Sequence, residues 1–512
     1  MLIIKNLTIQ TIKYNRILLQ DLSFSLMKND KIAIIGEEGN GKSTLLKAIC
    51  KSDEIMEYVK IEGSIDLQGD IVGYLPQNID SKWDSTDGFD YLYKNDVNDE
   101  IGLEVYNEYN ELYSILNKVK LNEDVLYRDI GKCSGGEKVK LGLAKVLLSK
   151  PNILILDEPT NDLDIETLEF LEDFIRNSVI PVLFVTHDET LLENVANGIL
   201  HLEQINRKTK SRWTFERIGY REYIEKRSML HDRISQIAVS EKRKHDEQME
   251  KYRHLYERVN HELNTVSRQD PATARLLKKK MKAVKSIGRR LENEELTHKE
   301  DVEEEIELFF DDSISLSDSK VILEMNNETI RIGDNILIDE MSLDIRGKDK
   351  VCIIGNNGCG KTTLLKGIEE RLKNRQDIMV GYMPQNYEEL LDLSVNAVSY
   401  LAGDNDKAYH SMVATRLGSL NFTRDEMNTS MNKLSQGQKA KILLLKLVLS
   451  KANVLLLDEP TRNLSPLTSP VIRNMLGDYG GCIISISHDR KYIDEVCNVV
   501  YKINNRKFLK LW

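Results

Sequence analysis

The sequence repeats itself once, and a glycine-rich loop of the same pattern opens the shared motifs in each half. The loops read GEEGNGKS over 36–43 and GNNGCGKT over 355–362. The serine of CSGGE lies 23 residues before the aspartate of ILILDEPT, and the serine of LSQGQ lies 23 residues before that of VLLLDEPT. The distance from that aspartate to a later histidine is 30 residues in both halves. Matching intervals over a period of roughly 300 residues indicate duplication of a whole domain, not an array of short units.

Each half alternates short apolar runs with longer helical patterns, which is typical of an α/β domain with a buried parallel sheet. The predicted strands cover 32–35, 153–156 and 182–185 in the first half, and 351–354, 454–457 and 483–486 in the second. In each half the first strand leads into the glycine-rich loop, the second ends in aspartate and the third ends near histidine. Because ligands bind at the carboxyl ends of parallel strands, we expect the chemistry at that edge.

The glycine-rich loops have the G-x-x-x-x-G-K-[ST] pattern, whose backbone N–H groups surround phosphates at the start of a helix. Lys42 and Lys361 would reach the β- and γ-phosphates of a nucleotide, and the hydroxyls of Ser43 and Thr362 would bind Mg²⁺. A chance glycine-rich turn is the alternative, and the recurrence in the same context argues against it. The predicted nucleotide contacts are Gly36, Glu37, Glu38, Gly39, Asn40, Gly41, Lys42, Ser43 and Thr44, and Gly355, Asn356, Asn357, Gly358, Cys359, Gly360, Lys361, Thr362 and Thr363.

Two acidic residues follow the second predicted strand of each half. Asp157 and Asp458 end hydrophobic runs, where a carboxylate can reach the Mg²⁺ shell. Glu158 and Glu459 come next and are placed to polarise an attacking water as general bases. The alternative is a carboxylate that only caps the end of a strand.

Gln77 and Gln385 occupy matching contexts, GYLPQN and GYMPQN, and each could bridge the metal and the water. A glutamine with no role beyond its loop is the alternative. His187 and His488 follow the third strand and could bind the γ-phosphate as a switch. Alone, each would be interpreted as a buried structural histidine, but the fixed spacing favours a catalytic role beside the glutamates.

These motifs resemble the ATP-binding cassette (ABC) family over nearly the whole chain outside about 220–310. In that family two cassettes enclose two ATP molecules head to tail, so the resemblance implies ATP and Mg²⁺ as cofactors and a monomer whose own cassettes pair. Implied site one combines the first phosphate loop with the second signature, which contributes Ser435, Gly437 and Gln438. Implied site two combines the second phosphate loop with the first signature, which contributes Ser134, Gly135, Gly136 and Glu137.

The two halves depart from each other at positions that bear on these sites. Gln436 replaces the first glycine of the signature, and the loop after DEPT ends in Asp164 in the first half but in Ser465 in the second. Tyr14 could stack on adenine, whereas the aligned residue of the second half is Gly333. The sequence therefore predicts two unequal ATP sites.

The segment between the halves carries a different charge from the rest of the chain. The net charge is −11 overall, yet residues 221–300 hold 20 Lys and Arg against 14 Asp and Glu, a net +6. Long helical patterns with a polar, proline-containing turn near 264–272 predict a helical hairpin. Its second helix has eight basic residues and no acid over 271–290, which favours phosphate-backbone contact over a merely solvated coiled-coil face. These are Arg275, Lys278, Lys279, Lys280, Lys282, Lys285, Arg289 and Arg290.

The predicted order is an ABC domain over 1–217, a hairpin linker over 218–310 and a second ABC domain over 311–512. Two fused cassettes with a helical linker resemble the ABC-F subfamily, and residues about 84–125 resemble its short arm insertion. That resemblance implies binding in the exit-tRNA site of the ribosome, with the hairpin touching rRNA and peptidyl-site tRNA and Arg268 as a tip contact.

The run DEPTRNLSP in the second half resembles the antibiotic-resistance branch, which protects ribosomes from drugs acting near the peptidyl-transferase centre. A housekeeping translation factor of the same subfamily is the first alternative. The ATPase subunit of a drug exporter would need a separate membrane partner. A DNA-repair ATPase would carry its coiled coil inside one cassette, not between two.

Composition places the chain among cytoplasmic proteins. No run of about 18 apolar residues is present, so no membrane span is expected. The first residues, MLIIK, lack the layout of a secretory signal. The six cysteines show no paired C-x-x-C spacing, which predicts neither a disulfide framework nor a zinc site.

Overall fold

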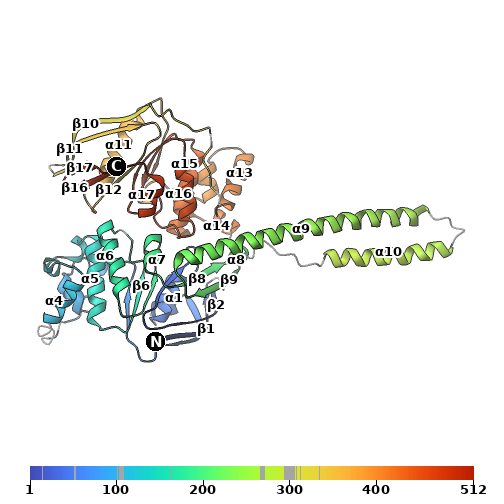
Figure 1. Cartoon of the computed structure of the whole chain (residues 1–512), viewed down its shortest axis with the longest axis horizontal. Coiled ribbons are helices and arrows are strands. Elements are labelled where there is room, and N and C mark those ends of the chain that lie inside the picture. Colours follow the sequence, from blue (N-terminus) through green and yellow to red (C-terminus); the bar gives the residue numbers. More distant parts are fainter. Residues whose placement is uncertain are drawn as a thin grey trace. The chain divides into compact units, whose positions relative to one another are not determined.

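The computed structural model describes residues 1–13, 15–50, 53–100, 102, 109–161, 163–265, 271–292, 306, 308–311, 313–333 and 335–512 (Figure 1). These residues form two compact units, one of Met1–Tyr220 with Glu305–Trp512 and one of Arg221–Glu304. The first unit contains both halves of the repeat, here called cassette 1 and cassette 2. The predicted contacts of Tyr14 with adenine and of Arg268 with RNA fall outside the described residues.

Cassette 1 is built on a six-stranded sheet in the order β5-β6-β7-β3-β8-β9, parallel except for the last strand. A second, antiparallel sheet has the order β2-β1-β4. The strands are β1 (Leu2–Thr11), β2 (Ile17–Leu26), β3 (Lys31–Ile35), β4 (Val59–Asp66), β5 (Val72–Leu75), β6 (Ile153–Asp157), β7 (Val182–Val185), β8 (Gly198–Gln204) and β9 (Lys210–Glu216). The helices are α1 (Lys42–Ile49), α2 (Asp53–Met56), α3 (Gly88–Tyr93), α4 (Tyr109–Lys118), α5 (Gly135–Leu148), α6 (Ile165–Asn177), α7 (Glu189–Val195) and α8 (Ile205–Lys208).

Cassette 2 repeats this plan with the sheet β13-β14-β15-β12-β16-β17 and a separate antiparallel pair, β10-β11. Its strands are β10 (Val321–Ile332), β11 (Asn335–Arg346), β12 (Lys350–Gly355), β13 (Val380–Met383), β14 (Val454–Asp458), β15 (Cys482–Ile486), β16 (Val499–Asn504) and β17 (Lys507–Lys510). Its helices are α11 (Lys361–Lys373), α12 (Ala397–Ala402), α13 (Lys407–Gly418), α14 (Arg424–Asn428), α15 (Gln436–Leu449), α16 (Ser469–Gly477) and α17 (Arg490–Val496).

The sequence forms these central strands because they are apolar on both faces. Every residue of β3, β6 and β7 is buried, as a parallel sheet covered by helices requires. Ile32 and Ile34 of β3 share one core with Leu45 and Leu46 of α1, which fixes the helix directly after the phosphate loop. The predicted α/β fold with two tandem cassettes is confirmed, and the carboxyl ends of β3, β6 and β7 meet at one edge.

The predicted arm over about 84–125 contains helices α3 and α4 in the structure. Helices α3 and α4 in this stretch correspond in order to α12 and α13 of cassette 2. The connection between them runs over 94–108 in cassette 1 but only over 403–406 in cassette 2. Residues 101 and 103–108 of this connection are outside the described residues, so the arm stays a prediction.

The second unit contains the hairpin, formed by most of α9 (Tyr220–Thr265) and by α10 (Pro271–Glu292). Residues 277, 281, 284, 288 and 291 of α10 are spaced at alternating steps of four and three and are buried, whereas Leu276 and Ile287 are exposed. Val259 of α9 packs against Met281 and Val284 between the helices. This spacing is that of a coiled-coil seam, and the other positions from Arg275 to Arg290 face water. Among the described residues, no helix is both long enough and apolar enough to cross a bilayer.

Candidate functional site

The phosphate loop of cassette 1 curls between the end of β3 and the first turn of α1. Gly36 has φ of 145°, and a Cβ there would lie 2.2 Å from the carbonyl oxygen of Leu202, so only glycine fits. The Nζ atom of Lys42 donates to the carbonyl oxygens of Gly36 at 2.8 Å and of Glu37 at 3.1 Å. The ammonium group therefore lies inside the curl, where a bound phosphate would meet it.

Cassette 2 forms the same loop with its own residues. Gly355 has φ of 155°, and a Cβ there would lie 2.7 Å from the carbonyl oxygen of Ile503. The Nζ atom of Lys361 donates to the carbonyl oxygens of Gly355 at 2.6 Å and of Asn356 at 3.1 Å. In both loops the lysine ammonium group therefore lies inside the curl, against two backbone carbonyl oxygens.

A hydroxyl and a carboxylate lie together beside each lysine. The hydroxyl of Ser43 donates to Asp157 at 3.0 Å, and that of Thr362 donates to Asp458 at 2.8 Å. Burial raises the pKa of both aspartates. Mg²⁺ in phosphoryl-transfer sites binds one or two protein oxygens and takes its remaining ligands from phosphate and water. The donor sets fit that ion, which would neutralise charge developing on the phosphates.

Glu158 is held by three side chains of cassette 1. It accepts hydrogen bonds from the amides of Gln77 at 2.7 Å and Asn161 at 2.9 Å, and Nε2 of His187 lies 3.0 Å from its second oxygen. Burial raises the pKa of Glu158, but His187 and Asn161 outweigh that effect and hold the pKa at about 2. The carboxylate is therefore ionised and oriented toward the loop.

Glu459 has a different environment in cassette 2. The backbone N–H of His488 donates to it at 3.2 Å, and the imidazole Nε2 stands 3.7 Å away. Burial and the neighbouring charge of Asp458 raise the pKa of Glu459 to about 8. Burial and the charge of Lys361 lower the pKa of His488 to about 4, so the ring is neutral at pH 7.

These geometries predict unequal behaviour of the two general-base positions. We expect Glu158→Gln to trap nucleotide at site one more strongly than Glu459→Gln does at site two, because Glu158 is already held by side-chain donors and Glu459 is not. Site-resolved trapping of labelled ATP by the two single variants measures the difference. Equal trapping would contradict the inference.

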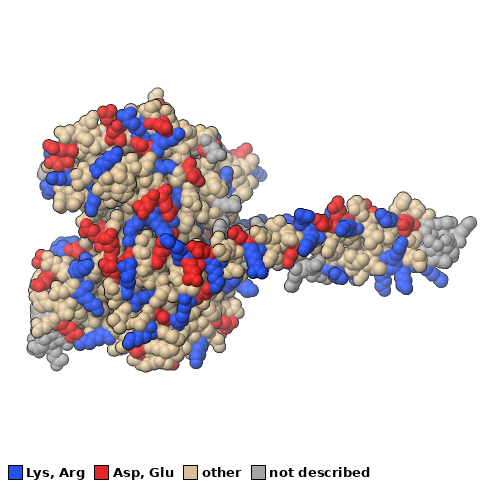
Figure 2. All heavy atoms as spheres, viewed as in Figure 1, with Lys and Arg blue, Asp and Glu red and all other residues tan. Residues whose placement is uncertain are grey.

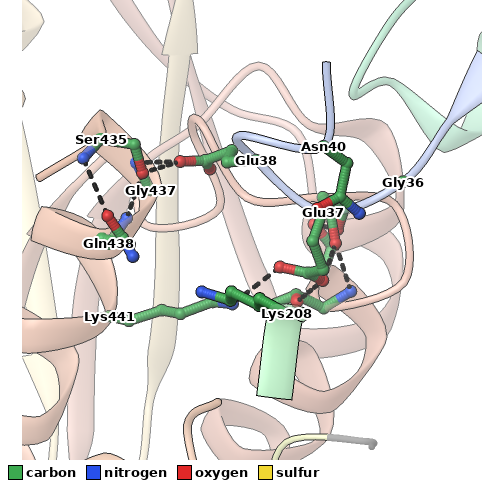
Figure 3. Close-up of polar contacts among 12 residues, drawn as sticks. Gly36, Glu37, Glu38, Asn40, Lys208, Ser435, Gly437, Gln438 and Lys441 are labelled. Atoms are coloured by element: carbon green, nitrogen blue, oxygen red, sulfur yellow. Dashed lines mark hydrogen bonds and ion pairs between the residues drawn. The ribbon is translucent and has the colours of Figure 1, made fainter. Parts of the chain in front are cut away.

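The signature motifs cap helices in both cassettes. Ser134 and Glu137 form a capping box at the start of α5, and Ser435 and Gln438 form one at the start of α15. The second signature meets the first phosphate loop: Glu38 accepts hydrogen bonds from the hydroxyl of Ser435 and the backbone N–H of Gly437 (Figure 3). The structure thus brings the predicted halves of site one together, through a glutamate side chain.

One cavity spans residues of both predicted sites, including Gln436 of the second signature. This cavity of about 960 Å³ is lined from cassette 2 by Lys361, Thr362, Gln385, Asp458, Glu459 and His488, and from cassette 1 by residues that include Gln77, Asn161 and His187. The four residues of the first signature, 134–137, are not among those lining it. Site two therefore has its predicted phosphate loop and carboxylates in one place, without the predicted signature.

Sequence reasoning missed several contacts. Asn161 directly follows the DEPT motif, and its pairing with Glu158 could have been suspected from that position. Tyr74, three residues before Gln77, donates a hydrogen bond to Asp157 at 3.2 Å. Lys441 and Thr468 contact Glu37 from the other cassette, and no local pattern announces them.

A pair of phosphate loops, each with a hydroxyl, an aspartate, a glutamate and a histidine at one sheet edge, defines a tandem nucleotide-hydrolysing protein. The family described as ABC transporter matches residues 19–161 and 338–462. The chain therefore belongs to the ABC transporter family, and it is an ATPase whose cassettes bind ATP.

Relatives match nearly the full length of this chain. The energy-dependent translational throttle protein EttA of Escherichia coli (strain K12) is 30% identical over 94% of this chain and 88% of its own length. The putative ATP-binding protein YdiF of Bacillus subtilis (strain 168) is 28% identical over 95% and 78%. ABC transporter F family member 5 of Arabidopsis thaliana is 25% identical over 95% and 73%.

Solved structures support the fold. The archaeal ribosome recycling factor aABCE1, in complex with the archaeal ribosomal stalk protein aP1, aligns with a TM-score of 0.62 at 18% identity. That alignment covers 99% of this chain and 90% of the other. A structure titled RNase-L Inhibitor aligns with a TM-score of 0.58 at 18% identity, over 98% and 89%. At this identity the likeness concerns the tandem arrangement of cassettes alone.

Proposed function

We propose that this protein is a cytoplasmic ATPase of the ABC-F type that binds the exit-tRNA site of the ribosome and protects it from antibiotics acting near the peptidyl-transferase centre. ATP closes the cassettes into the form that binds, and hydrolysis releases the protein. The observation that carries the proposal is the basic helix α10 in a hairpin joining two ATPase cassettes. The relative named as a translational throttle, which matches over 94% of the chain, supports a role in translation.

The hairpin has the chemistry that RNA contact requires. All eight predicted basic residues of α10 are exposed, because they lie outside the coiled-coil seam. Lys and Arg side chains project along the hairpin in Figure 2. No acidic residue interrupts them over 271–290, although Lys280 lies 3.9 Å from Glu262 of α9. Such a surface binds the phosphates of folded RNA by charge and shape, without reading sequence.

Within the ATPase cycle each group has a proposed task. Lys42 and Lys361 would exchange their carbonyl partners for the β- and γ-phosphates, and Ser43, Thr362 and the two aspartates would hold Mg²⁺. Glu158 would accept the proton of the attacking water, and Glu459 would do so when it is ionised. His187 and His488 would sense the γ-phosphate. Gln77, whose amide lies 2.7 Å from Glu158, would contact both the metal and the attacking water.

Neutralising the hairpin tests the proposed RNA contact. We expect Lys278→Ala, Lys282→Ala, Lys285→Ala and Arg289→Ala together to weaken ribosome binding and to lower the slope of log affinity against log salt by roughly 3 to 4, about one per lost phosphate contact. Co-sedimentation with ribosomes across a salt series, with ATP, measures both. The matched control replaces four exposed lysines of the cassettes by alanine, namely Lys28, Lys60, Lys373 and Lys507. Equal slopes for hairpin variant and control would count against hairpin contact.

A housekeeping role in translation is the second candidate, favoured by the relative named as a translational throttle. Deletion of the gene separates the two roles. Drug protection predicts that the deletion strain becomes more susceptible to antibiotics acting near the peptidyl-transferase centre, and that the plasmid-borne gene restores growth. Unchanged susceptibility across those drugs, with altered translation, would favour the housekeeping role.

A further inference from the structure

Two glutamates distinguish the first phosphate loop from the second. Glu37 and Glu38 occupy the positions that Asn356 and Asn357 hold in the other loop. A phosphate loop gains nothing from two carboxylates beside the anion it binds, since like charges repel. In the structure both side chains turn away from the loop interior and contact cassette 2 (Figure 3).

Glu38 is bound at the first turn of α15. One carboxylate oxygen accepts hydrogen bonds from the hydroxyl of Ser435 at 2.5 Å and from the backbone N–H of Gly437 at 2.7 Å. A Cβ on Gly437 would lie 1.5 Å from the other oxygen, so the glycine is what admits the carboxylate. Free N–H groups and the helix dipole favour an anion at the start of a helix. Glu38 therefore occupies the donors that the proposed site one offers to a γ-phosphate.

Glu37 is bound just beside it. Its carboxylate accepts hydrogen bonds from the hydroxyls of Ser465 at 2.5 Å and Thr468 at 2.7 Å, and from Nζ of Lys441 at 2.8 Å. Burial raises the pKa of Glu37, but the charge and hydrogen bond of Lys441 outweigh it and hold that pKa well below its usual range. The side chain is thus an ionised, fully paired anchor.

Two of the sequence differences between the halves are related, because the residues concerned contact each other. Ser465 stands where cassette 1 has Asp164. A carboxylate at 465 would face the carboxylate of Glu37 instead of donating to it. The glutamates in the first loop and the missing carboxylate in the second cassette thus form one complementary contact. Asn357, the counterpart of Glu38, lines the open cavity at the second loop.

We propose that Glu37 and Glu38 form a latch, an internal anionic ligand that occupies the second signature until ATP displaces it. The latch occupies the donors of site one without nucleotide and so raises the ATP concentration at which site one fills. This inference rests on the proposed role of Ser435 and Gly437 in completing site one. The two glutamates of the first loop and Ser465 of the second cassette would therefore act together to delay nucleotide binding at site one relative to site two.

The test uses the full chain without ribosomes. The Lys361→Ala background removes binding at site two. In that background we expect Glu37→Asn with Glu38→Asn to tighten binding of a non-hydrolysable ATP analogue at site one by about three- to tenfold. The reason is that the latch no longer competes with the nucleotide for the donors of site one. Without nucleotide, hydrogen exchange at the amide of Gly437 should rise. Glu57→Asn with Glu169→Asn, the same charge change at exposed positions of cassette 1, is the control.

A second variant opens the latch without touching the phosphate loop. Ser465→Asp restores the residue of the first half and places a carboxylate against Glu37, so we expect the same tightening and the same rise in exchange. In a Glu37→Gln background Ser465→Asp should add little, since the repulsion is gone. Unchanged or weaker analogue binding in both opened variants, with unchanged exchange at Gly437, would overturn the latch.

Failure of the proposed function looks different from failure of the latch. The first would be a wild-type protein whose association with ribosomes ignores ATP, whatever the latch variants do to analogue binding. The second would be an ATP-dependent ribosome partner whose latch variants bind the analogue as the wild type does.

Discussion

Replacing Glu158 and Glu459 together by glutamine is expected to lower steady-state ATP turnover by about 100-fold to 10,000-fold, the usual contribution of a positioned general base. Glutamine keeps the shape of each side chain and cannot accept the proton of the attacking water. ATP binding should persist, because Lys42 and Lys361 are unchanged. Phosphate release and equilibrium nucleotide binding, measured on the same protein, separate the two effects.

The matched control removes binding instead of chemistry. Lys42→Ala with Lys361→Ala should lose nucleotide binding and turnover together, and it should not associate with ribosomes when ATP is added. The double glutamine variant should stay on ribosomes with ATP, since ATP hydrolysis no longer reopens the closed form. A double glutamine variant that turns ATP over within about tenfold of the wild type would remove both glutamates from the proposed role.

The parts of the sites that could be read from the sequence are those that one stretch of chain specifies alone. The loop around Lys42 follows from glycine spacing, and Asp157 and Glu158 follow from a buried strand with a polar end. The hairpin follows from helix formers without proline or glycine over 223–261, a polar turn and a second helical pattern. In each case the physical cause is local, so a repeated pattern is sufficient to predict it.

The contacts that could not be predicted join residues far apart in the chain. Glu38 meets Ser435 and Glu37 meets Lys441 across about 400 positions, and neither pairing leaves a pattern in one stretch. The replacement of Asp164 by Ser465 was visible as an asymmetry, yet its partner was not. Side-chain pairing across an interface depends on how two cassettes dock, which propensity and periodicity do not describe.

The same limit applies to the ion pairs between the cassettes. Arg473 of α16 is 3% exposed and donates to both carboxylate oxygens of Glu189 of α7, at 2.6 and 3.0 Å. Its Nε also donates to Glu495 at 2.6 Å. Burial raises the pKa of Glu189 in spite of this partner, which reflects the cost of taking the carboxylate out of water. The pair therefore fixes how the cassettes meet more than it adds stability.

Removing Arg473 should have the largest effect on the joined cassettes. We expect Arg473→Ala to cost about 3 kcal/mol, near the lower end of the usual penalty for removing the partner of a buried charge, because Lys491 still lies 3.5 Å from Glu189. Glu189 could regain water only if α7 and α16 separate, so hydrogen exchange in both helices should rise and the thermal midpoint should fall. Calorimetry and exchange measurements on the full chain without nucleotide test this.

Two variants decide whether the lost partner is the cause. Arg473→Leu with Glu189→Leu removes both charges and should recover most of the loss, because no buried carboxylate remains unpaired. Arg371→Ala breaks a partly exposed pair with Glu328 within cassette 2 and should cost under about 1 kcal/mol. If Arg473→Ala and Arg371→Ala shift the midpoint equally, the contact between α7 and α16 does not hold the cassettes together. If the double leucine variant is no better than Arg473→Ala, lost packing is responsible and not the stranded charge of Glu189.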